Sequence, residues 1–336
     1  LFSVTMVACF VVGQRVPFNA LEIIWDRTQF ANLSLLYLVF FVPFFFAACC
    51  IGLAFTCRNQ AINRIYFFDL LGAGAGAMLV IGLLFVTYPQ AALLVLVVVA
   101  LVASRLAGSG ETTRWPLTLG QFAWLLVVAV IAFGGGLSLR PSEFKGLSQA
   151  LQVVDSQVLA EASSPLGLLT VVDSSTVPVR HAPGLSFNAR HIPPEQLAVF
   201  TDAAGMSAIT RYDGNLASIA YLADVTAALP YTLLDDPDVL LLGAGGGDGV
   251  LMALYHDAGR IDAVELNPQM SAFVAHTYAD FAGHIYDDPR VTLHTAEARG
   301  FVAQNERQYD LIQIGLLDSF AAAGSGVQAL NESYLY

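Results

Sequence analysis

The chain has 336 residues, of which 56% are hydrophobic and 12% are charged, and its formal net charge is −12. Soluble domains contain about 45–50% apolar and about 25% charged residues, so the composition disfavours a purely soluble chain. It disfavours a disordered chain too, because disorder requires few apolar residues and high charge. The chain begins at Leu1 rather than at a methionine and stops at Tyr336 in mid-pattern, so we expect it to be a fragment of a longer protein.

The charges divide the chain into two unequal parts. Residues 1–139 hold six arginines, no lysine and four acidic residues, a net charge of +2, whereas residues 140–336 hold nine basic and 23 acidic residues, a net charge of −14. A field of this sign disfavours nucleic acid and suits a small cationic substrate. The acidic part has no cysteine and its histidines are dispersed, so we predict no metal site there.

Residues 1–139 are predicted to form a transmembrane helical region. A run of about 20 apolar residues crosses a hydrocarbon core of about 30 Å, and several runs exclude a lone signal peptide. Four spans and the end of a fifth are expected, at residues 33–56, 65–88, 89–104, 118–139 and 1–12. We place them in the plasma (inner) membrane. Four basic residues fall on each side, so the positive-inside rule leaves the orientation open.

Residues 140–235 are predicted to form a small β-rich subdomain. Two short strands are expected at residues 168–172 and 177–180, on either side of a turn at Asp173-Ser-Ser.

Residues 236–336 are predicted to form an α/β domain. Strands are expected at residues 239–242, 261–265, 291–294 and 311–314, with helical stretches between them. Such alternation is typical of an open, mostly parallel, doubly wound Rossmann-like sheet.

Polar groups follow the ends of these four strands, where such sheets bind ligands. A glycine loop follows the first strand, Glu265 ends the second, Glu297 follows the third and Asp318 follows the fourth. The loop contributes the candidate binding residues Gly243, Gly245, Gly246, Gly247, Asp248 and Gly249. Glu265 has the spacing from the loop at which an acid accepts hydrogen bonds from ribose hydroxyls.

The loop favours an S-adenosyl ligand over a phosphate-bearing nucleotide. Asp248 stands where the dinucleotide fingerprint requires glycine, and the G-K-[ST] of a P-loop is absent. An S-adenosyl group has a ribose and an adenine but no phosphate. It also carries an amine, with which Asp248 can pair.

Four segments resemble the spermidine synthase-like aminopropyltransferases: Gly245-Gly-Gly-Asp-Gly249, Val264-Glu265, Asp288-Pro-Arg-Val291 and Tyr309-Asp310. The resemblance covers about residues 150–336. It implies a class I S-adenosylmethionine methyltransferase-type fold, with decarboxylated S-adenosylmethionine as co-substrate. The apolar part looks like the membrane-fused bacterial branch of that family, and the acidic domain would then face the cytoplasm.

The resemblance also implies roles for single residues. Asp248 would hold the amine of the donor, Glu265 its ribose and Glu297 its adenine amino group. Asp318 would orient or deprotonate the attacking amine. Glu297 replaces the usual aspartate of the family, and Gly315 replaces the first acid of its D-S-S-D motif.

The acceptor side departs from the family in two further places. The S-x-Y-Q segment reads Ser164-Pro-Leu-Gly167. In the Y-x-E segment, Asp224 matches the glutamate and Tyr221 is one position out of frame.

Three functions remain open from the sequence. The first is a membrane-anchored aminopropyltransferase acting on a small cationic amine. The second is an S-adenosylmethionine-dependent methyltransferase. The third is a non-catalytic nucleoside-sensing domain that regulates a transporter-like bundle. A homo-oligomer is compatible with each of them.

Overall fold

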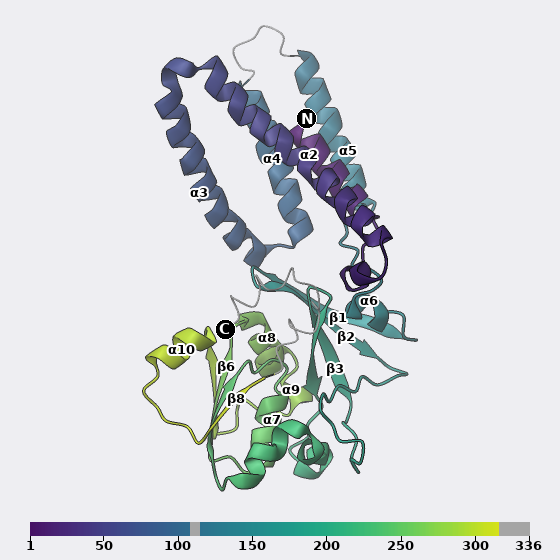
Figure 1. Ribbon diagram of the computed structural model, residues 1–336, viewed down its shortest axis with the longest axis vertical. Coiled ribbons are helices and arrows are strands. Elements are labelled where there is room, and N and C mark those ends of the chain that lie inside the picture. The colour runs from purple at the N-terminus through teal and green to yellow at the C-terminus, as the bar shows by residue number, and fades with distance from the viewer. Residues whose placement is uncertain (108–114, 316–336) are drawn as a thin grey trace. The chain divides into compact units, whose positions relative to one another are not determined.

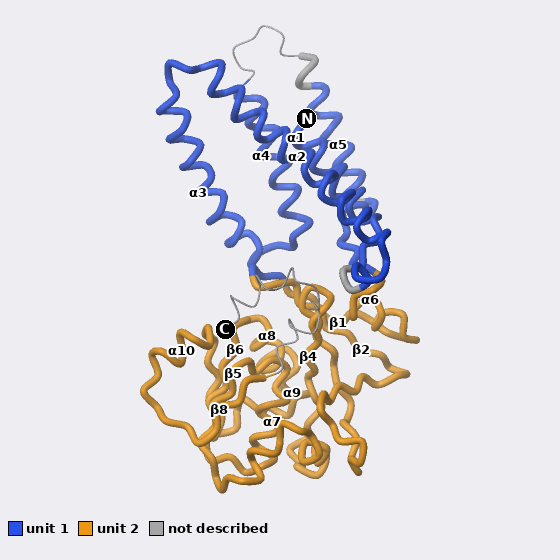
Figure 2. The backbone as a smooth tube through the Cα atoms, in the orientation of Figure 1, with its two compact units in different colours: residues 1–142, 163–165 blue, residues 143–162, 166–336 orange. Residues whose placement is uncertain are grey.

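The protein is described by a computed structural model that covers residues 1–107 and 115–315. The chain divides into two compact units (Figure 2). The first unit is residues 1–142 with 163–165, and the second is residues 143–162 with 166–336. Apolar helices make up the first unit, and the second contains both β-sheets.

Residues 1–142 of the first unit form helices joined by short loops, where they are described (Figure 1). Its elements are α1 (Phe2–Gly13), η1 (Ala20–Ile24), α2 (Thr28–Cys57), η2 (Asn59–Ala61), α3 (Ile62–Val86), α4 (Pro89–Ala107) and α5 (Trp115–Phe133). By length and composition, α2, η2 with α3, and α4 are long and apolar enough to cross a membrane. These correspond to three of the spans predicted from the sequence.

The bounds of α2 and α5 differ from those of the predicted spans. Helix α2 continues through Pro43 and is longer at both ends than predicted. Helix α5 ends at Phe133, before the predicted end of its span at residue 139. Three glycines, Gly134–Gly136, follow directly, and Gly135 has a φ of +73°. Glycine readily adopts this left-handed conformation, which ends a helix.

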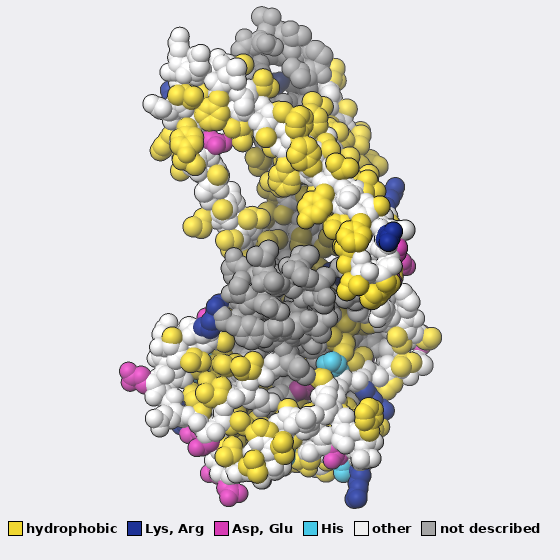
Figure 3. Space-filling model, viewed as in Figure 1, with side chains coloured by type: hydrophobic (Ala, Val, Ile, Leu, Met, Phe, Trp, Pro, Cys, Tyr) yellow, Lys and Arg dark blue, Asp and Glu magenta, His cyan; other side chains and the backbone are white. Residues whose placement is uncertain are grey.

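Large apolar side chains lie exposed on the first unit. No residue of α3 is buried, although the helix has 25 residues. Figure 3 shows hydrophobic side chains spread over the surfaces of these helices. A small cluster of Val7, Val97, Val128 and Leu137 packs α1, α4 and α5 together. The helices therefore contact one another through a minority of their apolar surface.

An antiparallel sheet opens the second unit, after the short helix α6 (Gly146–Ala150). Its strand order is β1-β2-β3-β4, with strands β1 (Ser156–Ser164), β2 (Gly167–Ser174), β3 (Gln196–Thr201) and β4 (Gly205–Thr210). β2 pairs antiparallel with β3, and β3 with β4. The predicted strand at 168–172 is confirmed as part of β2.

The predicted strand at residues 177–180 is wrong. Only an isolated bridge joins Val179 to Gln196 there. Pro178 has no N–H to donate to a ladder, so this segment cannot pair along its length. β2 lies instead between β1 and β3, and β3 begins more than 20 residues further along the chain.

A parallel sheet with the order β7-β6-β5-β8 forms the rest of the second unit. All four strands were predicted. They are β5 (Asp238–Leu242), β6 (Arg260–Glu265), β7 (Val291–Thr295) and β8 (Leu311–Ile314). The short helices η3 (Leu216–Asp224) and η4 (Thr226–Leu233) connect the two sheets in sequence. Apolar runs such as Val239–Leu242 suit central strands that are covered on both faces.

Helices lie on both faces of the parallel sheet (Figure 1). They are α7 (Asp248–Tyr255), α8 (Pro268–Ala272), η5 (Phe273–Thr277), α9 (Ala279–Ala282) and α10 (Ala298–Gln304). Residues of α7, α8, η5 and α9 share one core with Ile261 and Ala263 of β6 and with side chains of the antiparallel sheet. Asp262 alternates with these two and faces α10, whose Phe301 ring contacts His294. The sequence Asn267-Pro268 opens α8 as predicted, and the Asn267 side chain accepts a hydrogen bond from the Gln269 N–H.

Candidate active site at the end of strand β5

The glycine loop lies between β5 and α7, where the sequence placed it. Gly247 is the N-cap of α7 and has a φ of +95°, which favours glycine. A Cβ added to Gly246 would lie 1.8 Å from the carbonyl oxygen of Ala208 in β4. The loop therefore rests directly on the backbone of the antiparallel sheet.

Glu265, at the end of β6, holds the glycine loop. Its Oε2 accepts a hydrogen bond of 2.8 Å from the Gly245 N–H, and its Oε1 accepts one of 2.8 Å from the Asn267 N–H. Burial nevertheless raises the pKa of Glu265 above its ordinary value. The Tyr286 hydroxyl is buried and has no hydrogen-bond partner among the described residues. Its pKa is raised, mainly by burial and also by the charge of Glu265. Sequence reasoning gave no signal for this tyrosine.

Asp248 is the first residue of α7 and is partly buried. Its Oδ1 accepts a hydrogen bond of 2.6 Å from the Thr210 hydroxyl. Burial raises the pKa of Asp248 to about 6, against the opposing effect of that hydrogen bond. A carboxylate with a pKa in this range can be charged at neutral pH and still exchange a proton with a ligand.

Asp248 and the loop line one cavity of about 190 Å³. Its wall includes the predicted residues Gly243, Gly245, Gly246 and Gly249. It also includes His181, Tyr221 and Gln313, none of which was predicted as a binding residue. The structure thus brings Asp248 and most of the glycines together, and Glu265 joins them through its bond to Gly245.

The acceptor-side residues divide between the cavity and its surroundings. Tyr221 is buried in the cavity wall, and burial together with the charge of Asp248 raises its pKa. Asp224 does not line the cavity. Its Oδ2 accepts a hydrogen bond of 3.3 Å from the Arg190 N–H, and its carbonyl accepts one from Ser186.

Gly315 also belongs to the cavity wall, at the end of β8. Its N–H donates to the Leu242 carbonyl at 2.9 Å, and an added Cβ would lie 2.7 Å from the carbonyl oxygen of Gly243. The chain is therefore close-packed at this position. The predicted catalytic residue, Asp318, lies outside the described residues.

Glu297 lies apart from this cavity. Its carboxylate caps α10, accepting hydrogen bonds from the N–H groups of Arg299 at 3.1 Å and Gly300 at 2.7 Å. These bonds and the Arg299 guanidinium lower the pKa of Glu297. It lines a second cavity, of about 570 Å³, together with Asp262 and His294.

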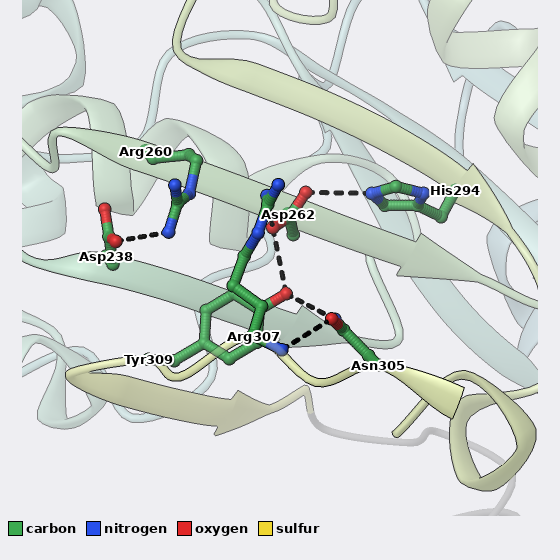
Figure 4. Close-up of polar contacts among 7 residues, drawn as sticks. All are labelled: Asp238, Arg260, Asp262, His294, Asn305, Arg307 and Tyr309. Carbon is green, nitrogen blue, oxygen red and sulfur yellow. Dashed lines mark hydrogen bonds and ion pairs between the residues drawn. The ribbon is translucent and has the colours of Figure 1, made fainter. Parts of the chain in front are cut away.

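A polar cluster around Asp262 was not predicted (Figure 4). The buried Asp262 carboxylate lies 2.8 Å from His294 Nε2, and it accepts hydrogen bonds of 2.9 Å from both Arg307 and Tyr309. Asn305 donates to the Tyr309 hydroxyl at 2.7 Å. These bonds outweigh desolvation and lower the pKa of Asp262. The cluster ties the segment after α10 to the middle of β6.

Among residues 1–107 and 115–315, no group of three or more His, Cys, Asp or Glu side chains is placed to hold a metal ion.

Two comparisons of the sequence with known proteins point to the same family. Residues 224–329 match the Spermine/spermidine synthase domain. A polyamine aminopropyltransferase of Korarchaeum cryptofilum is 30% identical over 117 residues, which are 34% of this chain and 35% of that protein. One from Streptococcus pneumoniae serotype 4 is 30% identical over 99 residues, 29% of this chain and 34% of that protein. The chain thus spans about a third of the length of these curated relatives.

Solved structures show a weaker likeness. A spermidine synthase in complex with the transition state analogue AdoDATO aligns at a TM-score of 0.32 and 19% identity, covering 47% of this chain and 46% of that one. A spermidine synthase from Thermotoga maritima aligns at a TM-score of 0.32 and 17% identity, covering 47% and 48%. These sequence matches support a spermidine synthase-like family for residues 224–329, and the matched relatives are transferases.

Proposed function

We propose that the second unit transfers an aminopropyl group from decarboxylated S-adenosylmethionine to an amine acceptor. The observation that carries this proposal is the partly buried carboxylate of Asp248 in a cavity walled by the glycine loop. A carboxylate there suits the cationic amine of the donor and repels a phosphate. The curated relatives support the same reaction, since they are polyamine aminopropyltransferases.

Each donor group has a candidate partner. Asp248 binds the donor's ammonium group, and Glu265, which already holds the loop at Gly245, binds the ribose. Glu297 binds the adenine amino group. Glu297 caps α10 and lines the second cavity. For this role its carboxylate must accept a hydrogen bond from the adenine amino group while it keeps its bonds to the N–H groups of α10.

The reaction is a displacement at carbon. The nitrogen of the neutral amine attacks the methylene beside the sulfonium, the carbon–sulfur bond breaks, and methylthioadenosine leaves with the bonding electron pair. Because the acceptor amine is an ammonium ion at neutral pH, a carboxylate first accepts one proton from it, and the secondary amine formed by the attack keeps its positive charge. Asp318 is the proposed acceptor of that proton. The acidic domain concentrates cationic substrates around the site.

Calorimetry on the full chain in detergent tests this proposal by measuring the affinities for three ligands. Preference for decarboxylated S-adenosylmethionine over S-adenosylmethionine and methylthioadenosine supports aminopropyl transfer. Preference for S-adenosylmethionine favours methyl transfer instead. Absence of binding to all three contradicts both enzyme functions and favours a role for the helical unit.

We also propose that the first unit anchors the protein in the plasma (inner) membrane, with the second unit in the cytoplasm. In support, three helices have the length and composition of membrane spans, and α3 leaves all of its 25 residues unburied. Burying such apolar surface is favourable by about 25 cal/mol per Å². Extraction at high pH and a topology reporter fused after Lys145 test this. Release into the soluble fraction, or a periplasmic reporter signal, contradicts it.

A further inference from the structure

A chain of buried hydrogen bonds lies behind Asp248. Gln196 is fully buried at the start of β3, and Thr210 is buried at the end of β4. The Gln196 Nε2 donates to the Thr210 hydroxyl at 2.9 Å, and that hydroxyl lies 2.6 Å from Asp248 Oδ1. The Tyr221 hydroxyl lies 3.5 Å from the same Thr210 oxygen.

The backbone of His181 fixes the direction of these hydrogen bonds. The Gln196 Oε1 accepts from the His181 N–H, and the Gln196 Nε2 donates to the His181 carbonyl at 3.1 Å. A reversed amide would set donor against donor and acceptor against acceptor. Nε2 must therefore face Thr210 as a donor. Since a threonine hydroxyl has one hydrogen, that hydrogen is left for Asp248.

From this directed chain we propose that Thr210 is a positioning residue, held by Gln196, that keeps one oxygen of Asp248 as a hydrogen-bond acceptor and so favours the carboxylate form that binds the donor's ammonium. This inference rests on the proposed function for its ligand. Asp248, not Thr210, contacts that ligand. A hydrogen bond to a charged acceptor contributes about 1.5–3 kcal/mol, which corresponds to about a tenfold change in affinity or more.

The surroundings of Asp248 disfavour its charged form, and the Thr210 hydrogen bond opposes that effect. Burial raises the pKa of Asp248 to about 6, and the Thr210 hydrogen bond is the effect that lowers it. Among the described residues, the other titratable side chains that line this cavity are Tyr221 of η3 and His181, and Glu265 of β6 holds the loop. Without Thr210, Asp248 would be protonated over more of the neutral range and would lose its attraction for a cation.

The test compares three full-length variants in detergent. Thr210→Val removes the hydroxyl at nearly constant shape, Thr210→Ser retains it, and Thr170→Val removes a buried threonine hydroxyl in β2 that does not line the cavity. Affinities for decarboxylated S-adenosylmethionine and for methylthioadenosine, which has no ammonium group, are measured from pH 5 to 8.

We expect Thr210→Val to lower the affinity for decarboxylated S-adenosylmethionine about tenfold at pH 7. The pH midpoint, at which binding of this ligand is half-maximal, should rise. Methylthioadenosine affinity should change less than about twofold, because that ligand makes no ion pair with Asp248. Thr210→Ser and Thr170→Val should behave like the parent protein. Unchanged donor affinity and an unchanged midpoint in Thr210→Val would overturn the inference.

A second readout separates this inference from the proposed function. If the parent protein binds none of the ligands, the function fails, but the titration of Asp248 still tests Thr210. Carbon-13 labelled aspartate, with the signal assigned by Asp248→Asn, gives that titration by NMR. A higher pKa in Thr210→Val than in Thr210→Ser supports the positioning role, and equal values overturn it.

Discussion

Glu265 and Gly245 are joined by a hydrogen bond of 2.8 Å in which the glycine N–H donates to the Oε2 of the carboxylate. The other oxygen of Glu265 accepts from the Asn267 N–H at 2.8 Å. Both oxygens therefore act as acceptors for the backbone. One side chain thus connects the end of β6, the start of α8 and the glycine loop.

Replacement of Glu265 by glutamine should weaken ligand binding in general. Glutamine has one oxygen and one NH2 group, so one of the two backbone N–H groups loses its acceptor. An unpaired buried donor costs about 1–3 kcal/mol, and we expect about a tenfold loss of affinity for both the decarboxylated donor and methylthioadenosine. Calorimetry measures both. Glu306→Gln, an exposed glutamate after α10, is the matched control, and equal effects of the two variants would contradict the expectation.

The effect of Asp248→Asn on stability follows from the pKa of Asp248. Its pKa of about 6 lies above the ordinary value of 3.8, so the folded state binds a proton more tightly than the unfolded state. The free energy of unfolding therefore decreases as the pH rises from about 4 to about 6. Asparagine carries no charge and keeps an oxygen that can accept from Thr210.

We accordingly expect Asp248→Asn to stabilise the ligand-free protein at pH 7, by about 1–3 kcal/mol. The stabilisation should shrink towards pH 4, where the aspartate is already protonated. Thermal unfolding of the full chain at pH 4, 5, 6, 7 and 8 measures it. A difference between variant and parent that is the same at pH 4 and pH 8 would rule out the raised pKa.

The parallel sheet and its loop could be predicted because the relevant signals are local. Apolar runs such as Val239–Leu242 are bounded by glycine or by an acid, and the strand ends of a parallel sheet meet at one edge. Asp248 and Glu265 were found in this way. The roles assigned to them remain predictions, as does that of Asp318.

The missed parts of the site depend on contacts between distant segments. Gln196 meets Thr210 only because β3 and β4 pair with these two residues in register, and Thr210 meets Asp248 across 38 positions of sequence. A glutamine or threonine at a strand end gives no sign of burial. The Asp262 cluster is hidden for the same reason, because Arg307 reaches it from 45 residues away.

Gly246→Ala should disrupt the loop, whereas Gly249→Ala should not. The Cβ of alanine at position 246 would lie 1.8 Å from the Ala208 carbonyl oxygen, which is backbone and cannot rotate away. At position 249 the nearest atoms are Leu241 methyl groups at 3.6 Å, an ordinary contact. Overpacking costs about 1–3 kcal/mol or more, so the first variant should unfold at lower temperature and lose ligand binding. Equal melting temperatures for the two variants would contradict this packing.

Asp262→Asn should destabilise the second unit in a pH-dependent way. Hydrogen bonds to His294, Tyr309 and Arg307 lower the pKa of Asp262. The charged Asp262 therefore stabilises the folded state above about pH 4. This stabilisation is lost as the pH falls through the folded-state pKa, because protonation removes the charge. We expect Asp262→Asn to lower the free energy of unfolding by about 1–3 kcal/mol at pH 7. The value is modest because Arg307 is half exposed and solvent screens its charge.

Thermal unfolding at pH 7 and at pH 3 checks this expectation. The difference between Asp262→Asn and the parent should be large at pH 7 and smaller at pH 3. Glu306→Gln changes an exposed carboxylate after α10 and is the control. A loss of stability at pH 7 no larger than that of the control would show that the cluster around Asp262 contributes nothing to the fold.

Introducing an acid at Gly315, where the family resemblance places the first acid of the D-S-S-D motif, should not create or increase transfer activity. Any Cβ at this position would lie 2.7 Å from the Gly243 carbonyl oxygen, while the Gly315 N–H is bonded to Leu242. The strain falls on the glycine loop itself. We therefore expect Gly315→Asp and Gly315→Ala to lower the melting temperature alike and to weaken donor binding severalfold. The readouts are thermal unfolding, calorimetry and aminopropyl transfer to a panel of amines. The opposite outcome is a Gly315→Asp variant that melts like the parent and gains transfer activity. It would show that the glycine loop can move to admit the new side chain. The difference from the relatives would then be the missing acid and not the close packing.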